Sequence, residues 1–265
     1  MTWVTGSMTD RPFPNSTETG NVPEDLAVEM SHVQKSFGDL HVLLDINLIL
    51  HTGENLVILG KSGTGKSVLI KCIVGLVDLD EGTLFLLGQN TAELNEKELV
   101  ALRKKVGFLF QGDALYDSMS VRENLEFPLR RHLRSMSRTE IDSLVMEALQ
   151  NVGLTDAVEK TPAELSGGMR KRVGLARTLI VKPDIMLYDE PTAGLDPITS
   201  KEISSLILQV QKQFHTSSIV ITHDIECARR TANRIVVIRD GKCVAEGSFP
   251  ELEKSPDSWV RSFFE

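Results

Sequence analysis

The chain has 265 residues, of which 41% are hydrophobic and 25% are charged. These proportions are those of an ordinary globular protein, and the length allows one large domain or two small ones. The formal net charge of -8 argues against bulk binding to DNA, RNA or anionic lipid, because such binding needs a cationic surface. We therefore expect no nucleic-acid partner.

The N-terminal segment, residues 1–25, is predicted to be a flexible tail. It holds Pro12, Pro14 and Pro23 among Ser, Thr, Asn and Gly, and it has too few apolar residues to offset the entropy of ordering. A functional arm is the alternative. No part of the sequence has the roughly 20 consecutive apolar residues of a membrane span, and no secretory signal is evident. Any role at a membrane is therefore expected to go through a partner.

The pattern after this tail predicts two joined sheets. Strands are expected at Leu26–Ser36, His41–Leu50 and Thr83–Leu87, with a turn at Phe37–Leu40. They indicate a small antiparallel sheet. Short apolar strands alternate with helices further on, which indicates a mainly parallel α/β sheet covered on both faces. These strands are Asn55–Leu59, Val106–Phe110, Ile185–Tyr188, Ser218–Thr222 and Ile235–Arg239, and helices are expected at Ser67–Leu76 and Met169–Val181.

Residues 120–164 are predicted to be helical and to interrupt this core. Apolar residues at positions 141, 144, 145, 148, 149 and 152 form one stripe of a helix. Ser137 and Glu140 form a capping box in front of it, and Gly153 is suited to end it. The fold class is therefore an α/β P-loop NTPase core with an N-terminal antiparallel β subdomain and an inserted helical subdomain at about 112–164.

A complete phosphate-binding loop lies between a predicted strand and a predicted helix. The sequence GKSGTGKS matches the pattern G-x-x-x-x-G-K-[ST], and the glycines let successive backbone N–H groups point at phosphate oxygens. Lys66 is expected to reach the β- and γ-phosphates, and the hydroxyl of Ser67 to bind Mg²⁺. The residues of this site are Gly60, Lys61, Ser62, Gly63, Thr64, Gly65, Lys66 and Ser67. We therefore expect ATP and Mg²⁺ as cofactors.

Four polar residues follow other predicted strands. Asp189 and Glu190 follow an apolar strand, and groups at the carboxyl ends of parallel strands face the phosphates. Asp189 suits Mg²⁺, and Glu190 suits a general base for the attacking water. Gln111 is a candidate ligand for Mg²⁺ and a contact to that water, and His223 a candidate hydrogen-bond donor to the γ-phosphate. Solvated side chains at strand ends are the alternative for each.

A second glycine pair precedes the helix predicted at Met169–Val181. In Leu165–Met169 the glycines follow Ser166 and leave backbone N–H groups free at the helix N-terminus, where an anion is stabilised. A helix cap by Ser166 is the simpler interpretation. It leaves unexplained a second anion-binding terminus in a chain with one P-loop.

From Leu26 to about Ser248 the chain resembles the nucleotide-binding subunit of an ABC transporter. Walker A, Gln111, the LSGGM signature, the Walker B strand with Glu190, and His223 stand in the order of that family. The resemblance implies two subunits facing head to tail. ATP then lies between the P-loop of one copy and the signature residues of the other, Ser166, Gly167 and Gly168. It also implies catalytic roles for Glu190, His223, Gln111 and Lys66.

Three positions depart from the common pattern of that family. Phe37 stands where the resemblance implies an aromatic ring stacked on adenine, more often Tyr. Val68, after the P-loop, stands where most relatives have Thr, and it is counted among the nucleotide-binding residues. Met169 replaces the more common Gln of the signature. Because the glycine amides bind the phosphate, we expect little loss from that change.

Three further stretches resemble the Mla/Mce type of lipid-transport ATPase. They are GKSGTGKSVLIKCIVGL from Gly60, FLFQGDALYDSMSVRENLEFPLR from Phe108, and the C-terminal extension, residues 249–265, with the two residues before it. This likeness implies phospholipid transport through a pair of transmembrane permeases, with coupling helices docked near Gly112–Met119. It implies a place on the cytoplasmic face of the inner membrane, a periplasmic MCE lipid-binding protein and a STAS-domain partner.

Two other functions compete with transport as interpretations of the sequence. An ATPase of the same superfamily that regulates a non-transport envelope process, such as cell division, remains the alternative. An ABC protein acting on nucleic acid or ribosomes is disfavoured, because the chain has neither a long coiled-coil insertion between P-loop and signature nor a second ATPase unit. The sequence leaves the substrate and the direction of transport open.

Overall fold

A computed structural model describes residues 25–112, 114–132 and 136–265. In this part of the chain, ten strands form one sheet in the order β5-β4-β1-β2-β10-β9-β3-β8-β7-β6. The predicted tail lies outside the described residues, apart from Asp25. The strands are β1 (Leu26–Phe37), β2 (Leu40–His51), β3 (Asn55–Leu59), β4 (Glu81–Leu86), β5 (Gln89–Asn90), β6 (Val106–Leu109), β7 (Ile185–Asp189), β8 (Ser217–Thr222), β9 (Arg234–Arg239) and β10 (Lys242–Gly247).

The sheet has an antiparallel part and a parallel part. β1 pairs antiparallel with β2 and β4, whereas β3, β6, β7, β8 and β9 pair parallel. β10 joins the two parts, because it pairs with β9 along its length and with β2 at Lys242 and Asp45. The predicted fold class is confirmed. The sequence analysis did not predict β10.

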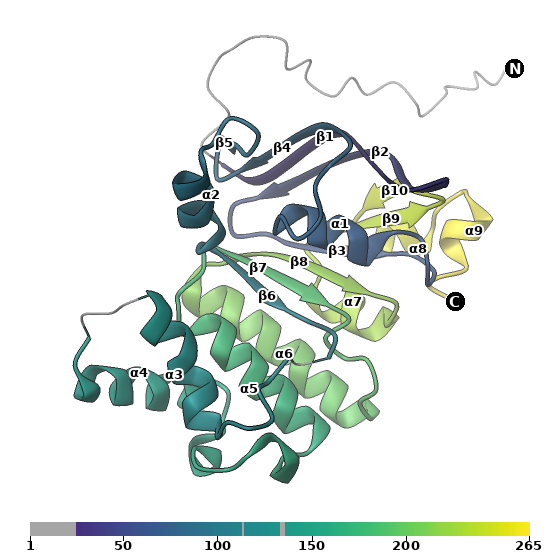
Figure 1. The fold of residues 1–265 in the computed structure, drawn as a ribbon. Coiled ribbons are helices and arrows are strands. Elements are labelled where there is room, and N and C mark those ends of the chain that lie inside the picture. Colours follow the sequence, from purple (N-terminus) through teal and green to yellow (C-terminus); the bar gives the residue numbers. More distant parts are fainter. Residues whose placement is uncertain (1–24, 113, 133–135) are drawn as a thin grey trace, which may run out of the picture.

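The helices cover the sheet on both sides (Figure 1). The α-helices of the described part are α1 (Lys66–Ile73), α2 (Glu96–Arg103), α3 (Val121–His132), α4 (Arg138–Asn151), α5 (Gly167–Leu179), α6 (Pro197–Phe214), α7 (Ile225–Thr231), α8 (Phe249–Glu253) and α9 (Ser258–Arg261). Two 3₁₀ turns, Thr155–Ala157 and Pro162–Glu164, lie between α4 and α5.

The central strand β3 explains why both faces need cover. All five of its residues are buried, and successive side chains of a strand point to opposite faces. Val57 and Leu59 pack in a cluster with residues of α3 to α7, whereas Leu56 and Ile58 pack in a cluster with α1, β1 and β2. The antiparallel part, α1 and α2 therefore cover one face of the parallel sheet, and α3 to α9 pack on the other.

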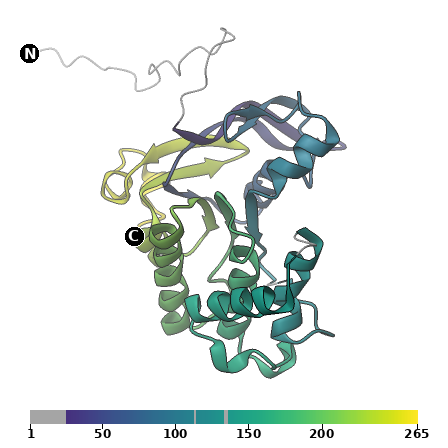
Figure 2. The ribbon, with the colours of Figure 1, turned by 90° about the vertical axis from the view of Figure 1, so that its left-hand side faces the viewer.

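The predicted helical region, residues 120–164, consists of separate elements. They are α3, α4 and the two 3₁₀ turns. α4 begins at the predicted capping box, with Ser137 as cap and Glu140 bonded back to it, and the predicted apolar stripe of this helix is buried or partly buried. It ends before Gly153, whose φ of 69° suits only glycine well. Figure 2 shows α3 and α4 at the end of the molecule away from β1, β2 and β4.

The C-terminal residues return to the core. Phe249 of α8 and Val260 and Phe264 in and after α9 are buried in the cluster that contains Ile235 and Val237 of β9. The rings of Phe249 and Phe264 meet edge to face at 4.9 Å. Residues 249–265 therefore pack on the same core as the P-loop strand. Among the described residues, no helix is long and apolar enough to cross a bilayer.

Candidate ATP site

The P-loop connects the buried strand β3 to α1 in a conformation that requires its glycines. Gly63 and Gly65 have φ angles of 82° and 93°, in the left-handed region. A Cβ on Gly65 would lie 2.9 Å from the backbone oxygen of Val42, and one on Gly60 would lie 2.7 Å from that of Ile238. The loop therefore lies tightly between β2 and β9, and its backbone amides form a concave surface of the kind that binds phosphate.

Lys66 is buried inside the loop that it belongs to. Its side chain donates hydrogen bonds from Nζ to the backbone oxygens of Gly60 and Lys61, at 2.7 and 2.9 Å. The residue is only 6% exposed. Burial lowers the pKa of Lys66, while the charges of Glu190 and Asp189 oppose that shift. The ammonium is thus held by carbonyl groups at the position where the loop would receive phosphate.

Ser67 and Asp189 bring two side-chain oxygen atoms together beside the loop. The hydroxyl of Ser67 donates to Oδ1 of Asp189 at 3.1 Å, and Asp189 is 6% exposed. Burial raises the pKa of Asp189, and the bond from Ser67 opposes that shift. A hydroxyl and a carboxylate fit Mg²⁺, which prefers oxygen and takes its other ligands from water and substrate phosphate. In the described ranges no cluster of three His, Cys, Asp or Glu offers an all-protein cage instead.

Glu190 and His223 are in direct contact. Oε2 of Glu190 lies 2.8 Å from Nδ1 of His223 and accepts the backbone N–H of the same residue at 3.3 Å. Glu190 has a φ of 50°, an unfavourable conformation for a side chain of this kind, and its N–H donates to Ile221 at 2.8 Å. The carboxylate side chain is 12% exposed, against 63% for His223. Strands β7 and β8 therefore fix a nearly buried carboxylate against an accessible imidazole.

Gln111 lies at the same edge of the sheet. It follows β6, which pairs with β7 through Leu109 and Tyr188, so Gln111 and Asp189 leave neighbouring strands at the same end. Its side chain is exposed, and its backbone oxygen accepts a hydrogen bond from Lys171 of α5. Among the hydrogen bonds of the described residues, none joins the Gln111 amide to Ser67 or Asp189. Its predicted role as a Mg²⁺ ligand stays a prediction.

The signature residues stand apart from this group. Ser166 caps α5 by accepting the N–H of Met169 at 3.2 Å, so the simpler of the two interpretations is observed. Ser166 is exposed, Gly167 is half-buried and Gly168 is buried. In the described part of the chain, no hydrogen bond or ion pair links Ser166–Gly168 to the P-loop. A serine cap uses one N–H, so it does not exclude an anion at this terminus.

Comparison with known proteins identifies the family. The chain matches the ABC transporter family over residues 43–193, which is more than half of its length. It belongs to the ABC transporter family. It is the ATP-binding subunit of a transport system and an ATP hydrolase of the ABC type, as its sequence predicted.

Several relatives align over most of the chain. A probable ribonucleotide transport ATP-binding protein, mkl, of Mycobacterium leprae is 39% identical over 92% of this chain and 70% of its own length. The Arabidopsis thaliana protein TRIGALACTOSYLDIACYLGLYCEROL 3, chloroplastic, is 38% identical over 90% of this chain and 73% of its own. The methionine import ATP-binding protein MetN of Clostridium tetani is 37% identical over 90% and 74%.

Solved structures share the fold. The ATP-binding cassette MJ0796, in a dimeric post-hydrolysis state bound to ADP and Pi, superposes with a TM-score of 0.76 at 33% identity over 83% of this chain and 98% of its own. CbiO1 of Clostridium perfringens, part of the ABC transporter complex CbiONQ, superposes with a TM-score of 0.79 at 27% identity over 91% and 100%. The signature helix of the present ABC subunit is α5.

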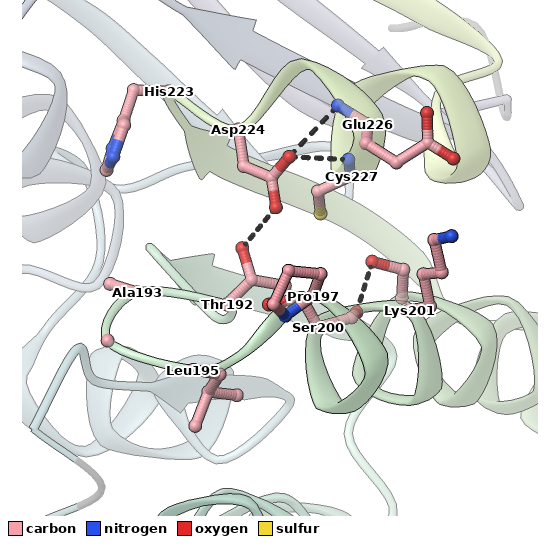
Figure 3. Close-up of a pocket in the computed structure, with 12 residues that line it drawn as sticks. Thr192, Ala193, Leu195, Pro197, Ser200, Lys201, His223, Asp224, Glu226 and Cys227 are labelled. Carbon is pink, nitrogen blue, oxygen red and sulfur yellow. Dashed lines mark hydrogen bonds between the residues drawn. The ribbon is translucent and has the colours of Figure 1, made fainter.

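A cavity of about 350 Å³ lies beside the Walker B loop of this ABC subunit. It is bounded by the loop Thr192–Leu195 and by His223 and Asp224 (Figure 3). Thr192 donates to Asp224 at 3.0 Å, and Asp224 also caps α7. This bridge holds the loop that follows Glu190 against the loop that carries His223. The thiol of Cys227 lines the cavity, but burial raises its pKa to about 11, so it is a poor nucleophile.

Phe37 and Val68 lie in different surroundings. Phe37 is the last residue of β1 and is 49% exposed. Nζ of Lys35 lies 5.4 Å from the centroid of its ring. An exposed aromatic face of this kind is suited to stack on a base. Val68 is in α1 and packs against the cluster of β1 and β2. Its side chain therefore serves the core, and only its backbone is suited to face a nucleotide.

Sequence reasoning missed the residues that hold the segment after Gln111. Asn124 of α3 has no exposed surface; its amide accepts the N–H of Tyr116 at 2.8 Å and donates to the oxygens of Tyr116, Met119 and Ser120 at 3.0 to 3.2 Å. Arg177 of α5 donates to the oxygen of Ala114 at 2.6 Å. Asn124 lies three residues after Val121 and next to Leu125, on the apolar face of its helix, and this position was the available signal.

Proposed function

We propose that this ABC subunit powers lipid transport across the envelope of a diderm bacterium through a partner permease. The observation that carries the proposal is the likeness of residues 60–76, 108–130 and 247–265 to the Mla/Mce type. The Arabidopsis relative supports it, because its name is that of a galactolipid. Other relatives are named for ribonucleotide transport and methionine import, so cargo is the part that experiment must decide.

The geometry supports a division of labour at the nucleotide. Loop amides and Lys66 bind the β- and γ-phosphates, and Phe37 stacks on the adenine. The hydroxyl oxygen of Ser67 lies 3.1 Å from Oδ1 of Asp189, and these two residues would hold Mg²⁺ together with Gln111. The ion supplies neutralisation of the charge on the phosphates when it is bound. Lys66 must exchange its two carbonyl partners for phosphate oxygens, which a charged donor gains from doing.

Glu190 and His223 are assigned to the hydrolytic step. Glu190 accepts a proton from the attacking water as general base, because its carboxylate is nearly buried and directed by β7 and β8 to the edge where the phosphates lie. His223 orients Glu190 through the 2.8 Å contact and donates to the γ-phosphate from its other ring nitrogen. This arrangement requires a hydrogen on both ring nitrogens when Glu190 is ionised, so His223 takes this role as the imidazolium.

The complete site requires a second copy of the chain. Ser166, Gly167 and Gly168 are assigned to the γ-phosphate bound by the partner copy. The support is that Ser166 is exposed and Gly167 half-buried at the start of α5, and that no described contact joins Ser166–Gly168 to the P-loop of the same chain. A homodimer also agrees with the dimeric state of the MJ0796 cassette.

Permease contact is assigned to the segment near Gly112–Met119. It carries Tyr116, which is 43% exposed, and Phe110, which precedes the segment in the chain, is 37% exposed. Exposed aromatic side chains of this kind suit the docking of a coupling helix. The segment is also tied to α5 by Lys171 and Arg177, so motion of the signature helix moves the permease contact. An MCE protein and a STAS-domain protein belong to the same proposal and locate the chain at the inner face of the inner membrane.

The test is the cargo dependence of ATP hydrolysis by the complex purified from native membranes through a tag on this chain. We expect a permease and an MCE protein to copurify, and phospholipid to stimulate hydrolysis in the reconstituted complex. The same complex with Glu190→Gln is the control for contaminating ATPases. Stimulation by methionine or a ribonucleotide would contradict the lipid proposal, and recovery of division proteins would favour the envelope-regulation alternative.

A further inference from the structure

The C-terminal helix α9 places an aromatic ring beside the P-loop. Nζ of Lys61, the second residue of the loop, lies 6.0 Å from the ring centroid of Trp259, and Cζ of Arg239 lies 4.7 Å from it. Two cations therefore share one indole, the aromatic ring that attracts cations most strongly. Neither the sequence motifs nor the proposed site assigns Trp259 a role at the nucleotide.

Trp259 is held in place by the core. Val260 has no exposed surface, and Phe264 is 8% exposed, so the segment that carries Trp259 is fixed to the body of the protein. Asp257 accepts the N–H of Trp259 at 2.8 Å and lies 3.9 Å from Arg239. Phe263 packs edge to face on the indole at 4.9 Å. The ring is thus a fixed support rather than a freely rotating surface group.

Lys61 is a structural centre of the phosphate loop. Its backbone oxygen accepts hydrogen bonds from Nζ of Lys66 and from Oγ1 of Thr64, both at 2.9 Å. The loop also touches the strand that carries Arg239, because a Cβ on Gly60 would lie 2.7 Å from the oxygen of Ile238. A restraint on the side chain of Lys61 is therefore a restraint on the residue to which Lys66 is bonded.

We propose that Trp259 is a positioning residue for ATP binding, which acts by holding Lys61 and Arg239 at the entrance of the P-loop. The proposal rests on the P-loop as the ATP site and not on the nature of the cargo. The restraint lowers the entropy that the loop loses when ATP binds, so its removal weakens ATP binding while the catalytic step is unchanged. A cation–π contact of about 0.5–1 kcal/mol corresponds to about a two- to fivefold change in affinity.

Four variants of the full-length chain test the proposal by titration with a fluorescent, non-hydrolysable ATP analogue. Trp259→Ala and Lys61→Gln are each expected to raise the Kd about two- to fivefold, and the double variant no further, because both remove the same contact. Trp259→Phe keeps an aromatic face and is expected to restore most of the affinity. Lys254→Gln, which removes an exposed lysine from the same C-terminal segment, is the charge-matched control.

A spectroscopic measurement separates positioning from mere stabilisation. The chain has two tryptophans, Trp3 and Trp259, so Trp3→Phe makes Trp259 the reporter. Its emission is expected to change on nucleotide titration with the midpoint of the measured Kd, and to stop responding in the Lys61→Gln background. Unchanged emission together with a wild-type Kd for Trp259→Ala would overturn the proposal. So would a fall in kcat at unchanged KM in the transporter complex. No cargo enters these titrations, so an incorrect lipid assignment would leave their result unchanged.

Discussion

The P-loop and the signature are both glycine-bearing turns at helix N-termini, yet the chain treats them differently. In the P-loop, left-handed glycines, neighbouring backbone atoms and a buried lysine enclose the cradle within one chain. At the signature, Ser166 is exposed and a Cβ on Gly167 would meet nothing closer than 3.4 Å. The P-loop turn is packed against its own fold, whereas the signature turn is open at Ser166 and Gly167 and is packed only at Gly168, against Thr199. A site shared between two copies requires one packed turn, the P-loop, and one open turn, the signature.

The largest effect is expected from a substitution that leaves both turns intact and removes the proposed base, Glu190. Glu190→Gln should reduce hydrolysis by about 10²–10⁴-fold, because an amide cannot accept the proton of the attacking water. ATP binding should persist at both turns. Single-turnover hydrolysis of radiolabelled ATP, with equilibrium binding measured alongside, checks the split. Substantial residual hydrolysis would remove Glu190 from its assigned role.

Ser166→Arg should break the open turn alone. The large cation would fill the space left for the γ-phosphate of the other copy, and we expect hydrolysis to fall about 10²-fold, the cost of losing a backbone donor set of this kind. Binding of ATP to the isolated chain should be unchanged. Turnover against binding is the measurement, and Ser205→Arg, on the exposed outer face of α6, is the matched control. Normal turnover in Ser166→Arg would refute the shared site.

Lys66→Ala should break the enclosed turn alone. Loss of a charge-assisted hydrogen bond of about 1.5–3 kcal/mol weakens ATP binding by about 10- to 150-fold. Calorimetric titration of the isolated chain measures this directly, with Lys61→Ala as a comparison in the same loop that leaves Lys66 in place. If Lys66→Ala bound ATP normally, the loop would not be the primary site.

The smallest effect is expected on stability. It compares a glycine of the P-loop with a glycine of the signature. Gly65→Ala should lower the free energy of unfolding by about 2 kcal/mol or more, because the left-handed backbone disfavours a Cβ and Val42 and Leu43 occupy its space. Gly167→Ala should be neutral or stabilise by up to about 1 kcal/mol, because alanine favours the helix. Urea denaturation measures both. Equal losses would mean that the signature turn is as tightly packed as the P-loop.

Sequence reasoning found the parts that are continuous along the chain. The P-loop, the acids after β7 and the capping box at Ser137 are each short patterns whose residue types fix their local conformation. The strand Asn55–Leu59 was predicted to the residue, because it is apolar after Asn55 and a glycine follows it. Within residues 120–164 only the helix between Ser137 and Gly153 was given bounds, because the other breaks depend on turns that packing stabilises and that composition indicates weakly.

Short sequence patterns did not predict the tertiary contacts that join distant residues. The contact of Glu190 with His223 spans 33 positions and that of Lys61 with Trp259 about three quarters of the chain, and neither contact has a pattern in the sequence. The four bonds of Asn124 depend on burial that one sequence does not display. Local chemistry therefore specified an ATPase and predicted two anion-binding turns. Folding, by bringing strand ends and the C-terminal helix together, enclosed one turn and left the other open, because only buried surface supplies fixed neighbours.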